Sequence, residues 1–276
     1  MKIKRKWENI VFYIVLILLA AFWMAPLILA LLNSFKSNGE LLTNILSIPK
    51  TLSLINYKRS IEKMHFFRSM RNTLFLSIFS VVLIVFFSSL AGWKLCRTKT
   101  KLSSMIYHLI IFSMLIPFSS IMIPLYRVVL AFHIKNNLFG LSFVYAGLGV
   151  GMAIFLYYQF VKEIPIELEE AAEMDGSSQL NTFFKIIFPL LKNVTITVCI
   201  TNFLWIWNDF LLPLIMISDN KKYTLILSTN TLFGQYSNDW SAILSALIMV
   251  VIPAIIIYIL FQKQIMHSIT DSAIKG

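Results

Sequence analysis

Uncharged apolar runs, each long enough to cross a lipid bilayer, constrain this chain more than any other feature. A membrane-spanning helix needs about 20 apolar residues, because each residue advances about 1.5 Å and the hydrocarbon layer is about 30 Å thick. Five stretches without Asp, Glu, Lys or Arg meet this length: 9–35, 72–93, 102–126, 136–161 and 240–262. A sixth stretch, 193–218, is interrupted only by Asp209. The runs predict an all-α polytopic membrane protein with six transmembrane helices.

The six spans are predicted at about 9–32, 72–93, 102–124, 138–161, 190–214 and 240–262. They form one transmembrane domain, 9–262, which includes a loop at 162–189, and they leave an N-terminal segment, 1–8, and a tail, 263–276. The first apolar run is too long for the core of a cleaved signal peptide, so we expect it to be retained as a helix. An even number of spans places both ends of the chain on one side.

The composition excludes a soluble domain and a disordered chain. The sequence is 58% hydrophobic and 13% charged, whereas soluble domains have about 25% charged residues. Disordered chains have low hydrophobicity. The formal charge of +11 is assigned to basic loops beside a membrane, so no nucleic-acid partner is expected. The four histidines and two cysteines show no metal-ligand spacing, so no metal site is expected.

Basic residues near the predicted spans indicate the orientation. Positive residues accumulate in short loops on the cytoplasmic side. The segment 2–6 and the loop 94–101 each carry four Lys or Arg residues, and both lie on the same side of the six-span arrangement. The longer loop 36–71 carries seven on the other side, which opposes the bias. We predict cytoplasmic N- and C-termini in a bacterial cytoplasmic membrane.

One predicted cytoplasmic loop is acidic although the chain is basic. Six of the 13 acidic residues fall in it: Glu163, Glu167, Glu169, Glu170, Glu173 and Asp175. Pro165 suits the first position of a helix, Gly176 suits the left-handed residue after its end, and Ser177 or Ser178 can cap a second helix. The loop is therefore predicted to fold as a helix–turn–helix bracket. Its acids are either a solvated surface or a surface for a basic partner groove.

The same loop carries a motif. It contains Glu170-Ala171-Ala172, Asp175, Gly176, Ile186, Phe188 and Pro189. This spacing resembles the EAA loop of ABC importer permeases, and it departs from that pattern only at Phe188, where leucine is usual. The resemblance implies a type I ABC importer permease fold.

The resemblance extends over almost the whole chain, and it is closest to the smaller membrane subunit of maltose-type, carbohydrate-uptake importers. The residues that carry it are Asn56-Tyr57, Asn72, Pro117, residues 123–126, Trp207-Asn208, Asp239-Trp240, Pro253 and residues 273–276. The tail 267–272 departs from the glycine-rich pattern usual in this branch.

The resemblance implies partners and roles. Such a permease pairs with a second, related permease, docks on two cytoplasmic ATPase subunits that bind ATP and Mg²⁺, and meets an extracytoplasmic binding protein through residues 219–239. Glu170 is implied as the charged anchor in an ATPase cleft, which small Ala171 and Ala172 allow the helix to enter. Gly176 makes the turn, with Asp175 before it, and Ile186 and Pro189 fix the second helix. ATP-driven closure would then pull on the bracket.

The chain itself has no phosphate-loop motif and no nucleophile–base arrangement, so we expect neither ATP hydrolysis nor other catalysis in it, and no cofactor. Asn202, Trp205, Asn208 and Asp209 are candidates for a sugar path, although the resemblance implies that the sister permease holds most sugar contacts. Asp209 is interpreted equally as a functional group or as an anchor at the membrane interface. Besides sugar import, the sequence leaves open a permease for another solute such as a polyamine or phosphorylated polyol. A secondary carrier and a membrane enzyme are disfavoured.

Overall fold

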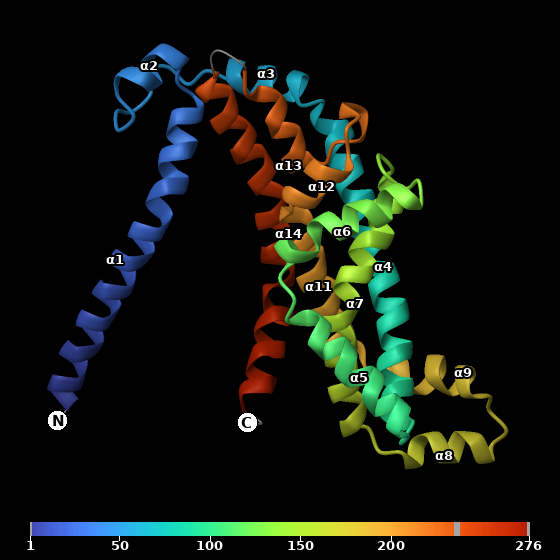
Figure 1. Cartoon of the computed structure of the whole chain (residues 1–276). Helices are drawn as coiled ribbons and strands as arrows, with labels where there is room; N and C mark the ends of the chain where they lie inside the picture. The colour runs from blue at the N-terminus through green and yellow to red at the C-terminus, as the bar shows by residue number, and fades with distance from the viewer. Residues whose placement is uncertain (1, 235–237, 275–276) are drawn as a thin grey trace. The chain divides into compact units, whose positions relative to one another are not determined.

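The computed structural model describes residues 2–234 and 238–274, which contain helices and no strand (Figure 1). The chain divides into two compact units. Unit 1 comprises Met1–Phe67 and Ser228–Pro253, and unit 2 comprises Arg68–Leu227 and Ala254–Gly276. The division shows that the first predicted span belongs with the start of the last, while the four spans between them form the second unit.

Unit 1 contains one long helix and several short ones. Its elements are α1 (Lys2–Ser34), α2 (Asn38–Thr43), α3 (Ile55–Lys63), a 3-10 turn η3 (Thr229–Leu232) and the beginning of α14 (Trp240–Ile274). Within α1, Asn9–Ser34 is apolar enough to span a membrane, and none of its most apolar stretch is buried among the described residues. A helix that exposes apolar side chains all round is suited to contact with lipid or with other membrane helices.

The connection between α1 and α3, residues 35–54, is fixed by a buried lysine. Lys36 is fully buried, and its Nζ donates hydrogen bonds to the carbonyl oxygens of Asn44 at 2.9 Å and Ile45 at 3.2 Å. The Asn56 amide donates to the carbonyls of Ser34 and Lys36, both at 2.8 Å. The ammonium and the amide therefore bind backbone carbonyls that a loop would otherwise leave to water.

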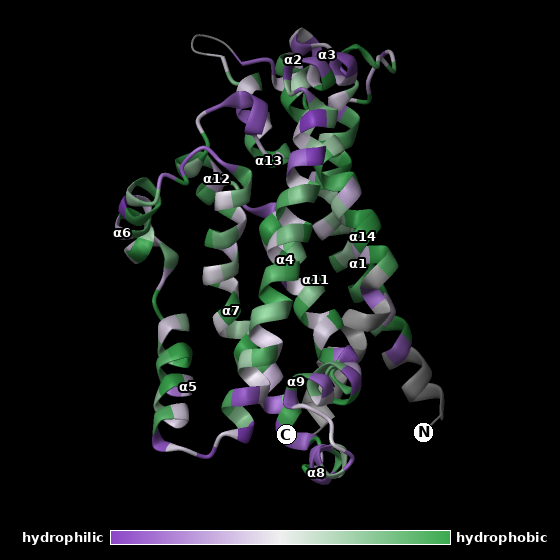
Figure 2. Cartoon of the chain, turned by 90° about the vertical axis from the view of Figure 1, so that its right-hand side faces the viewer, coloured by the Kyte–Doolittle hydropathy of each residue, from purple (hydrophilic) through white to green (hydrophobic). Residues whose placement is uncertain are grey.

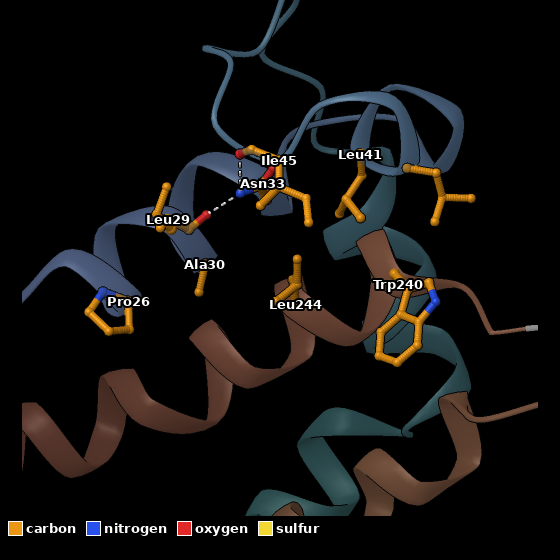
Figure 3. A pocket seen from close by; sticks show the side chains of 9 residues that line it. Pro26, Leu29, Ala30, Asn33, Leu41, Ile45, Trp240 and Leu244 are labelled. Carbon is orange, nitrogen blue, oxygen red and sulfur yellow. Dashed lines mark hydrogen bonds between the residues drawn. The ribbon is translucent and has the colours of Figure 1, made fainter.

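An apolar pocket lies between this connection and the helices of unit 1 (Figure 3). Asn33 forms its polar part, and its amide nitrogen donates to the carbonyls of Leu29 at 2.7 Å and Ile45 at 3.0 Å. The lining residues are Pro26, Leu29, Ala30, Asn33, Leu41, Leu42, Ile45, Trp240 and Leu244. The bond to Leu29 lies within α1, and the bond to Ile45 holds the connection against α1 beside the pocket.

Unit 2 is built on long apolar helices. Its larger elements are most of α4 (Phe66–Arg97), α5 (Lys101–Met114), α6 (Phe118–Ala131), α7 (Leu138–Glu163) and α11 (Lys192–Asn208). The shorter α12 (Leu211–Met216), η2 (Asn220–Lys222) and α13 (Leu225–Ser228) follow. Figure 2 shows hydrophobic residues along α7 and α11 and hydrophilic residues near the ends of the long helices. This distribution is the one expected of helices in a bilayer.

Glycines allow close packing of α4, α7 and α11. A Cβ atom at Gly92 would lie 2.7 Å from Cβ of Tyr157, and one at Gly149 would lie 2.6 Å from Cδ1 of Ile84 and 2.9 Å from Oδ1 of Asn202. A larger residue at Gly92 would push α4 and α7 apart, whereas one at Gly149 would require the ends of the Ile84 and Asn202 side chains to shift. Small residues at such crossings are typical of packed membrane helices.

The candidate spans differ in part from the predicted ones. Among the described residues, four helices are long and apolar enough to cross a membrane, or up to six if each of two bent pairs is one span. The predicted third span, 102–124, is not one helix, since α5 and α6 meet at an angle of 107°. The break comes at Pro117, which has an extended backbone. Proline lacks an N–H and disfavours helix at the residue before it.

The predicted fifth span, 190–214, also differs. The helix α11 ends at Asn208, and Asp209 has an extended backbone before α12 begins. The segment that precedes α11, Gln179–Leu190, is bent by 77° relative to it. The apolar run therefore contains one long helix and a separate short one. Whether each bent pair crosses the membrane as one span stays a prediction.

Candidate functional site

The acidic loop folds as a bracket of short helices at the end of unit 2 where α4 and α7 end (Figure 1). We use the name bracket for residues 164–190. It consists of α8 (Glu167–Met174), α9 (Gln179–Thr182), a π-helical turn η1 (Phe183–Ile187) and α10 (Phe188–Leu190). The predicted helix–turn–helix is present, with a first helix of eight residues.

The start of α8 differs from the prediction. Ile166 is the N-cap residue, so Pro165 precedes the helix and does not occupy its first turn. Glu167, Glu169 and Glu170 lie in that first turn, where the positive end of the helix dipole stabilises carboxylates. The clustered acids therefore favour the helix that presents them.

The turn after α8 has the geometry that its glycine predicts. Gly176 has φ of +80°, a left-handed conformation. The Ser177 N–H donates to the Ala172 carbonyl at 2.9 Å, and the Gly176 N–H donates to the Glu173 carbonyl at 3.0 Å. These two bonds form a Schellman motif, which ends a helix sharply. A Cβ atom at Gly176 would meet nothing within 4 Å, so only the backbone conformation requires glycine here.

The second arm of the bracket begins at Ser178, whose hydroxyl accepts the Asn181 N–H at 3.4 Å, and it widens into the π-helical turn η1 before Pro189. A proline cannot donate to the carbonyl four residues earlier, which favours such a widened turn. Ile186 is partly buried against the core of unit 2, whereas Pro189 is exposed. The prediction that both fix this arm to the bundle therefore finds packing support only at Ile186.

Glu169 points inward and is held by α4. Its Oε1 accepts a hydrogen bond from Arg97 Nε at 2.6 Å, and its Oε2 accepts one from Trp93 Nε1 at 2.9 Å. The side chains of Arg97 and Glu169 are only 16% and 11% exposed. Removing one partner of a buried ion pair costs on the order of 3–5 kcal/mol, because the other charge is left without compensation.

The neighbouring residues on α8 divide between two faces. Ala172 is buried on the inner face with Glu169, whereas Glu170 and Ala171 are exposed. Met174, four residues after Glu170, is 88% exposed. We use the name outer face of α8 for Glu170, Ala171 and Met174. Asp175 is also exposed, at the end of the helix.

A polar hollow of about 240 Å³ lies between α4 and the bracket. Glu170 and Glu173 lie at it together with Lys94 and Gln179, whose side chains are joined by a hydrogen bond of 3.0 Å. The two glutamates are exposed, and no described residue forms an ion pair with them. The bracket therefore offers carboxylates to a cationic partner without first having to break an internal pair.

The residues predicted for a substrate path are only partly brought together. Tyr145 joins two of them: its hydroxyl donates to Asp209 Oδ2 at 2.8 Å, and its ring meets that of Trp205 edge to face at 5.4 Å. The other Asp209 oxygen accepts the Leu211 N–H at 2.9 Å. Asp209 thus stabilises the break between α11 and α12, and both of its predicted roles stay predictions.

The two asparagines have different surroundings. Asn202 is buried, and its amide donates to the Val198 carbonyl at 2.8 Å. Asn208 is exposed, and its amide donates to the Leu204 carbonyl at 2.8 Å. Both side-chain amides are bound to their own helix, so the assignment of these residues to a substrate path stays a prediction.

Two contacts at these sites were not predicted from the sequence. The Tyr145 hydroxyl stands in a long apolar run without a neighbouring charge that would mark it, and Arg97 counted only as one of several basic residues beside the second span. The separation of four residues between Trp93 and Arg97 was a usable signal, because residues four apart share one helix face.

Comparison with solved structures defines the class of protein. The chain is similar to a chain of a bacterial ABC transporter involved in the import of the acidic polysaccharide alginate, with a TM-score of 0.81 over 94% of this chain and 96% of that chain. The sequence identity is 23%, so the likeness is one of fold. The predicted all-α type I ABC importer permease fold is confirmed.

Sequence comparison then gives the family. A family model described as "Binding-protein-dependent transport system inner membrane component" matches residues 84–270. The chain belongs to this family, whose members are multi-pass membrane subunits of ABC importers, and the resemblance inferred from the EAA spacing is confirmed.

Named relatives support the assignment over nearly the full length. The chain is 40% identical to a probable starch degradation products transport system permease protein, AmyC, of Thermoanaerobacterium thermosulfurigenes, over 94% of both chains. It is 32% identical to the melibiose/raffinose/stachyose import permease protein MelC of Bacillus subtilis, over 91% of both. It is 33% identical to the multiple sugar-binding transport system permease protein MsmG of Streptococcus mutans, over 91% of this chain and 92% of that one.

Proposed function

We propose that the chain translocates a sugar or oligosaccharide into the cell and that a separate ATPase subunit supplies the energy. The relatives are named for starch degradation products, for melibiose, raffinose and stachyose, and for multiple sugars. Membership of a binding-protein-dependent family implies an ATPase and a solute-binding protein as partners. The chain itself supplies the path and the mechanical coupling, and the ATPase subunit supplies hydrolysis.

The proposed contact with the ATPase rests on the outer face of α8. It combines the exposed carboxylate of Glu170, the small exposed Ala171 and the nearly fully exposed Met174. Methionine is enriched at protein interfaces, and a carboxylate without an internal partner attracts a cation. A short rigid helix with this face suits insertion into a partner cleft that contains a basic residue.

The other motif residues serve the shape of the bracket. Ala172 is buried on the inner face of α8, and Gly176 with Asp175 before it ends the helix. Ile186 packs the second arm on unit 2, and Pro189 ends its widened turn. In the proposed complex these residues hold α8 in place while Glu170 and Ala171 meet the ATPase.

We infer the remaining partners and the orientation from the same assignment. The bracket and both termini would lie in the cytoplasm, and two ATPase subunits would bind ATP and Mg²⁺ there. A second, related permease would complete the path as a heterodimer in the bacterial cytoplasmic membrane, surrounded by lipid, with the binding protein on the opposite side. The basic residues of 2–6 and 94–101 support this orientation.

For the substrate path we keep Asn202, Trp205, Asn208 and Asp209 as candidates. Trp205 is 41% exposed and offers an aromatic face, and Asn208 beside it is also exposed. Aromatic faces and amides suit the binding of polyols. Asp209 would act by fixing Tyr145 and the break after α11, and would not contact the solute directly.

The experiment uses the whole transporter, purified from cells that express all of its subunits. We expect Glu170→Lys to abolish co-purification of the ATPase and Gly176→Val to reduce it, with loss of solute uptake in both. The first substitution reverses the anchoring charge, and the second forces a β-branched residue into a left-handed conformation. Glu62→Lys, an exposed acid on α3, is the matched control and should leave assembly and uptake unchanged.

Normal ATPase assembly and normal uptake in both bracket variants would overturn the coupling assignment. The solute is tested separately, by measuring which compounds bind to the co-purified binding protein. A ligand such as a polyamine or a phosphorylated polyol would overturn the sugar assignment and leave the coupling assignment intact. Uptake that needs an ion gradient and no ATPase would overturn both.

A further inference from the structure

The last turn of α4 contacts every segment of the bracket up to η1. Arg97 Nη2 donates to the Ile164 carbonyl at 2.8 Å, at the point where α7 ends, and Arg97 Nε donates to Glu169 on α8. Lys94 Nζ donates to Gln179 on α9. One helix end therefore contacts the entry to the bracket and both of its first two helices.

Trp93 adds the fourth contact. Its ring lies 5.0 Å from the ring of Phe183 in η1, and both residues are buried. Its indole N–H donates to Glu169. Trp93 and Arg97 are four residues apart and so project from one face of α4. The two oxygens of the Glu169 carboxylate are thus each held by a donor from this single face.

The position of Glu169 separates it from the docking residue beside it. Glu169 is buried and paired with α4, whereas Glu170 is exposed and unpaired among the described residues. A displacement applied to Glu170 by a partner would move α8 as a body. Because Glu169 is on the same rigid helix, that displacement would reach Arg97 and Trp93 through two charge-assisted hydrogen bonds.

We propose that Glu169, Arg97 and Trp93 form the joint that transmits movement of the bracket to α4, and that they position α4 during transport without contacting ATP or solute. The inference rests on the proposed function, because it needs an ATPase that moves α8. The joint also includes the end of α7, since the same guanidinium binds the Ile164 carbonyl. A planar guanidinium can hold a carboxylate and a carbonyl together, and a lysine cannot match that geometry.

The test measures coupling and assembly separately. The complete transporter, with sister permease, ATPase subunits and binding protein, is reconstituted in liposomes, and ATP hydrolysed per solute imported is measured. Glu169→Gln keeps the size of the side chain and replaces one acceptor oxygen with a donor. We expect the ATPase to co-purify in unchanged stoichiometry while the ATP consumed per solute rises about tenfold, within the range typical of coupling between sites.

Two further variants make the outcome decisive. Trp93→Phe removes the indole donor, keeps an aromatic ring against Phe183 and leaves the ion pair, so it should raise the ratio less than Glu169→Gln does. The double variant Arg97→Glu with Glu169→Arg again places opposite charges at the two positions. It should therefore recover part of the coupling that either single substitution loses. The control is Arg59→Gln, which breaks the Arg59–Asp239 pair in unit 1 and should leave the ratio unchanged.

A purely structural role is distinguishable from this one. If Glu169→Gln and Trp93→Phe lower the yield or the thermal midpoint while the assembled transporter keeps the wild-type ratio of ATP to solute, the joint is overturned. If the unaltered chain purifies without any ATPase subunit, the proposed function fails, whatever the Glu169 variants do.

Discussion

Each of two connections in this molecule is bound by a cation with little exposure to solvent, Lys36 in unit 1 and Arg97 in unit 2, and the two differ in what the cation binds. In unit 1, Lys36 donates to carbonyl oxygens eight and nine residues away, in its own connection. In unit 2, Arg97 donates to Glu169, 72 residues away, and to the Ile164 carbonyl, 67 residues away. The first cation closes a local loop, and the second joins α4 to two elements far along the chain, the end of α7 and α8.

This difference shows which connection can transmit force. The bonds of Lys36 stay within its own connection, which the Asn56 amide of α3 and the Trp240 N–H of α14 also bind. The bracket cannot move without pulling on Glu169 and thereby on α4. The contacts suit a static role for the α1–α3 connection and a transmitting role for the bracket. We test this difference with pairs of matched substitutions, one in the bracket or at its contacts and one in unit 1.

The largest effect is expected at the buried ion pair. Arg97→Ala leaves the Glu169 carboxylate buried without its cation and should lower the free energy of unfolding by about 3–5 kcal/mol. Arg59→Ala breaks the more exposed pair with Asp239 and should cost less than about 1 kcal/mol. Thermal unfolding of the purified protein in detergent measures both. Equal effects of the two substitutions would contradict the account.

The buried lysine should rank second. Lys36→Met keeps most of the side-chain stem and removes two hydrogen bonds from a charged donor, so we expect a loss of about 1.5–3 kcal/mol in the free energy of unfolding. Because the two Lys36 bonds stay within its own connection, the ATP consumed per solute should stay at the wild-type value. A change in that ratio comparable to the one from Glu169→Gln would remove the distinction between the two connections.

The next comparison is between Gly176 and Gly39, two glycines that have room for a side chain. Gly176→Ala places a Cβ in a left-handed conformation and should cost about 1–2 kcal/mol. Gly39→Ala, within α2, should instead stabilise the protein by up to about 1 kcal/mol, because alanine favours helix. Neither Cβ would meet an atom within 4 Å, so opposite signs in thermal unfolding isolate the backbone effect. The same sign for both would refute that explanation of Gly176.

The smallest effects are expected at two serine caps. Ser178 caps α9 and Ser37 caps α2, each by accepting a backbone N–H on its hydroxyl. Substitution of either by alanine should cost about 0.5–2 kcal/mol, typically near 1. Since the capping chemistry is the same, the two losses should be similar. A loss of coupling only in Ser178→Ala would show that the second arm of the bracket is part of the joint.

The sequence predicted those features that depend on local chemistry. Long uncharged runs predicted apolar helices, Gly176 predicted the left-handed turn, and Ser178 was one of two expected caps. The spacing of the EAA motif led to the family, which the comparisons confirmed. These features depend on residues within a few positions of each other, which is why they could be predicted from the sequence.

The features that were missed depend on distant contacts. Pro117 lies inside the predicted third span, 102–124, yet it separates helices that meet at 107°. Glu169 was one acid among six, and only the position of α4 shows that it is buried and paired while Glu170 stays exposed. The partner of Asp209, Tyr145, lies 64 residues away on another helix. Patterns in single segments carry no information on which faces of two helices meet.

The central claim is that α8 meets the ATPase through its outer face. The most direct measurement places a photoreactive side chain at position 171 and, for comparison, at position 46, where Leu46 in unit 1 is 78% exposed. After irradiation of the assembled transporter in membranes, we predict a covalent adduct with the ATPase subunit from position 171 and none from position 46. A transporter that imports solute normally but gives no ATPase adduct from position 171 would contradict the account.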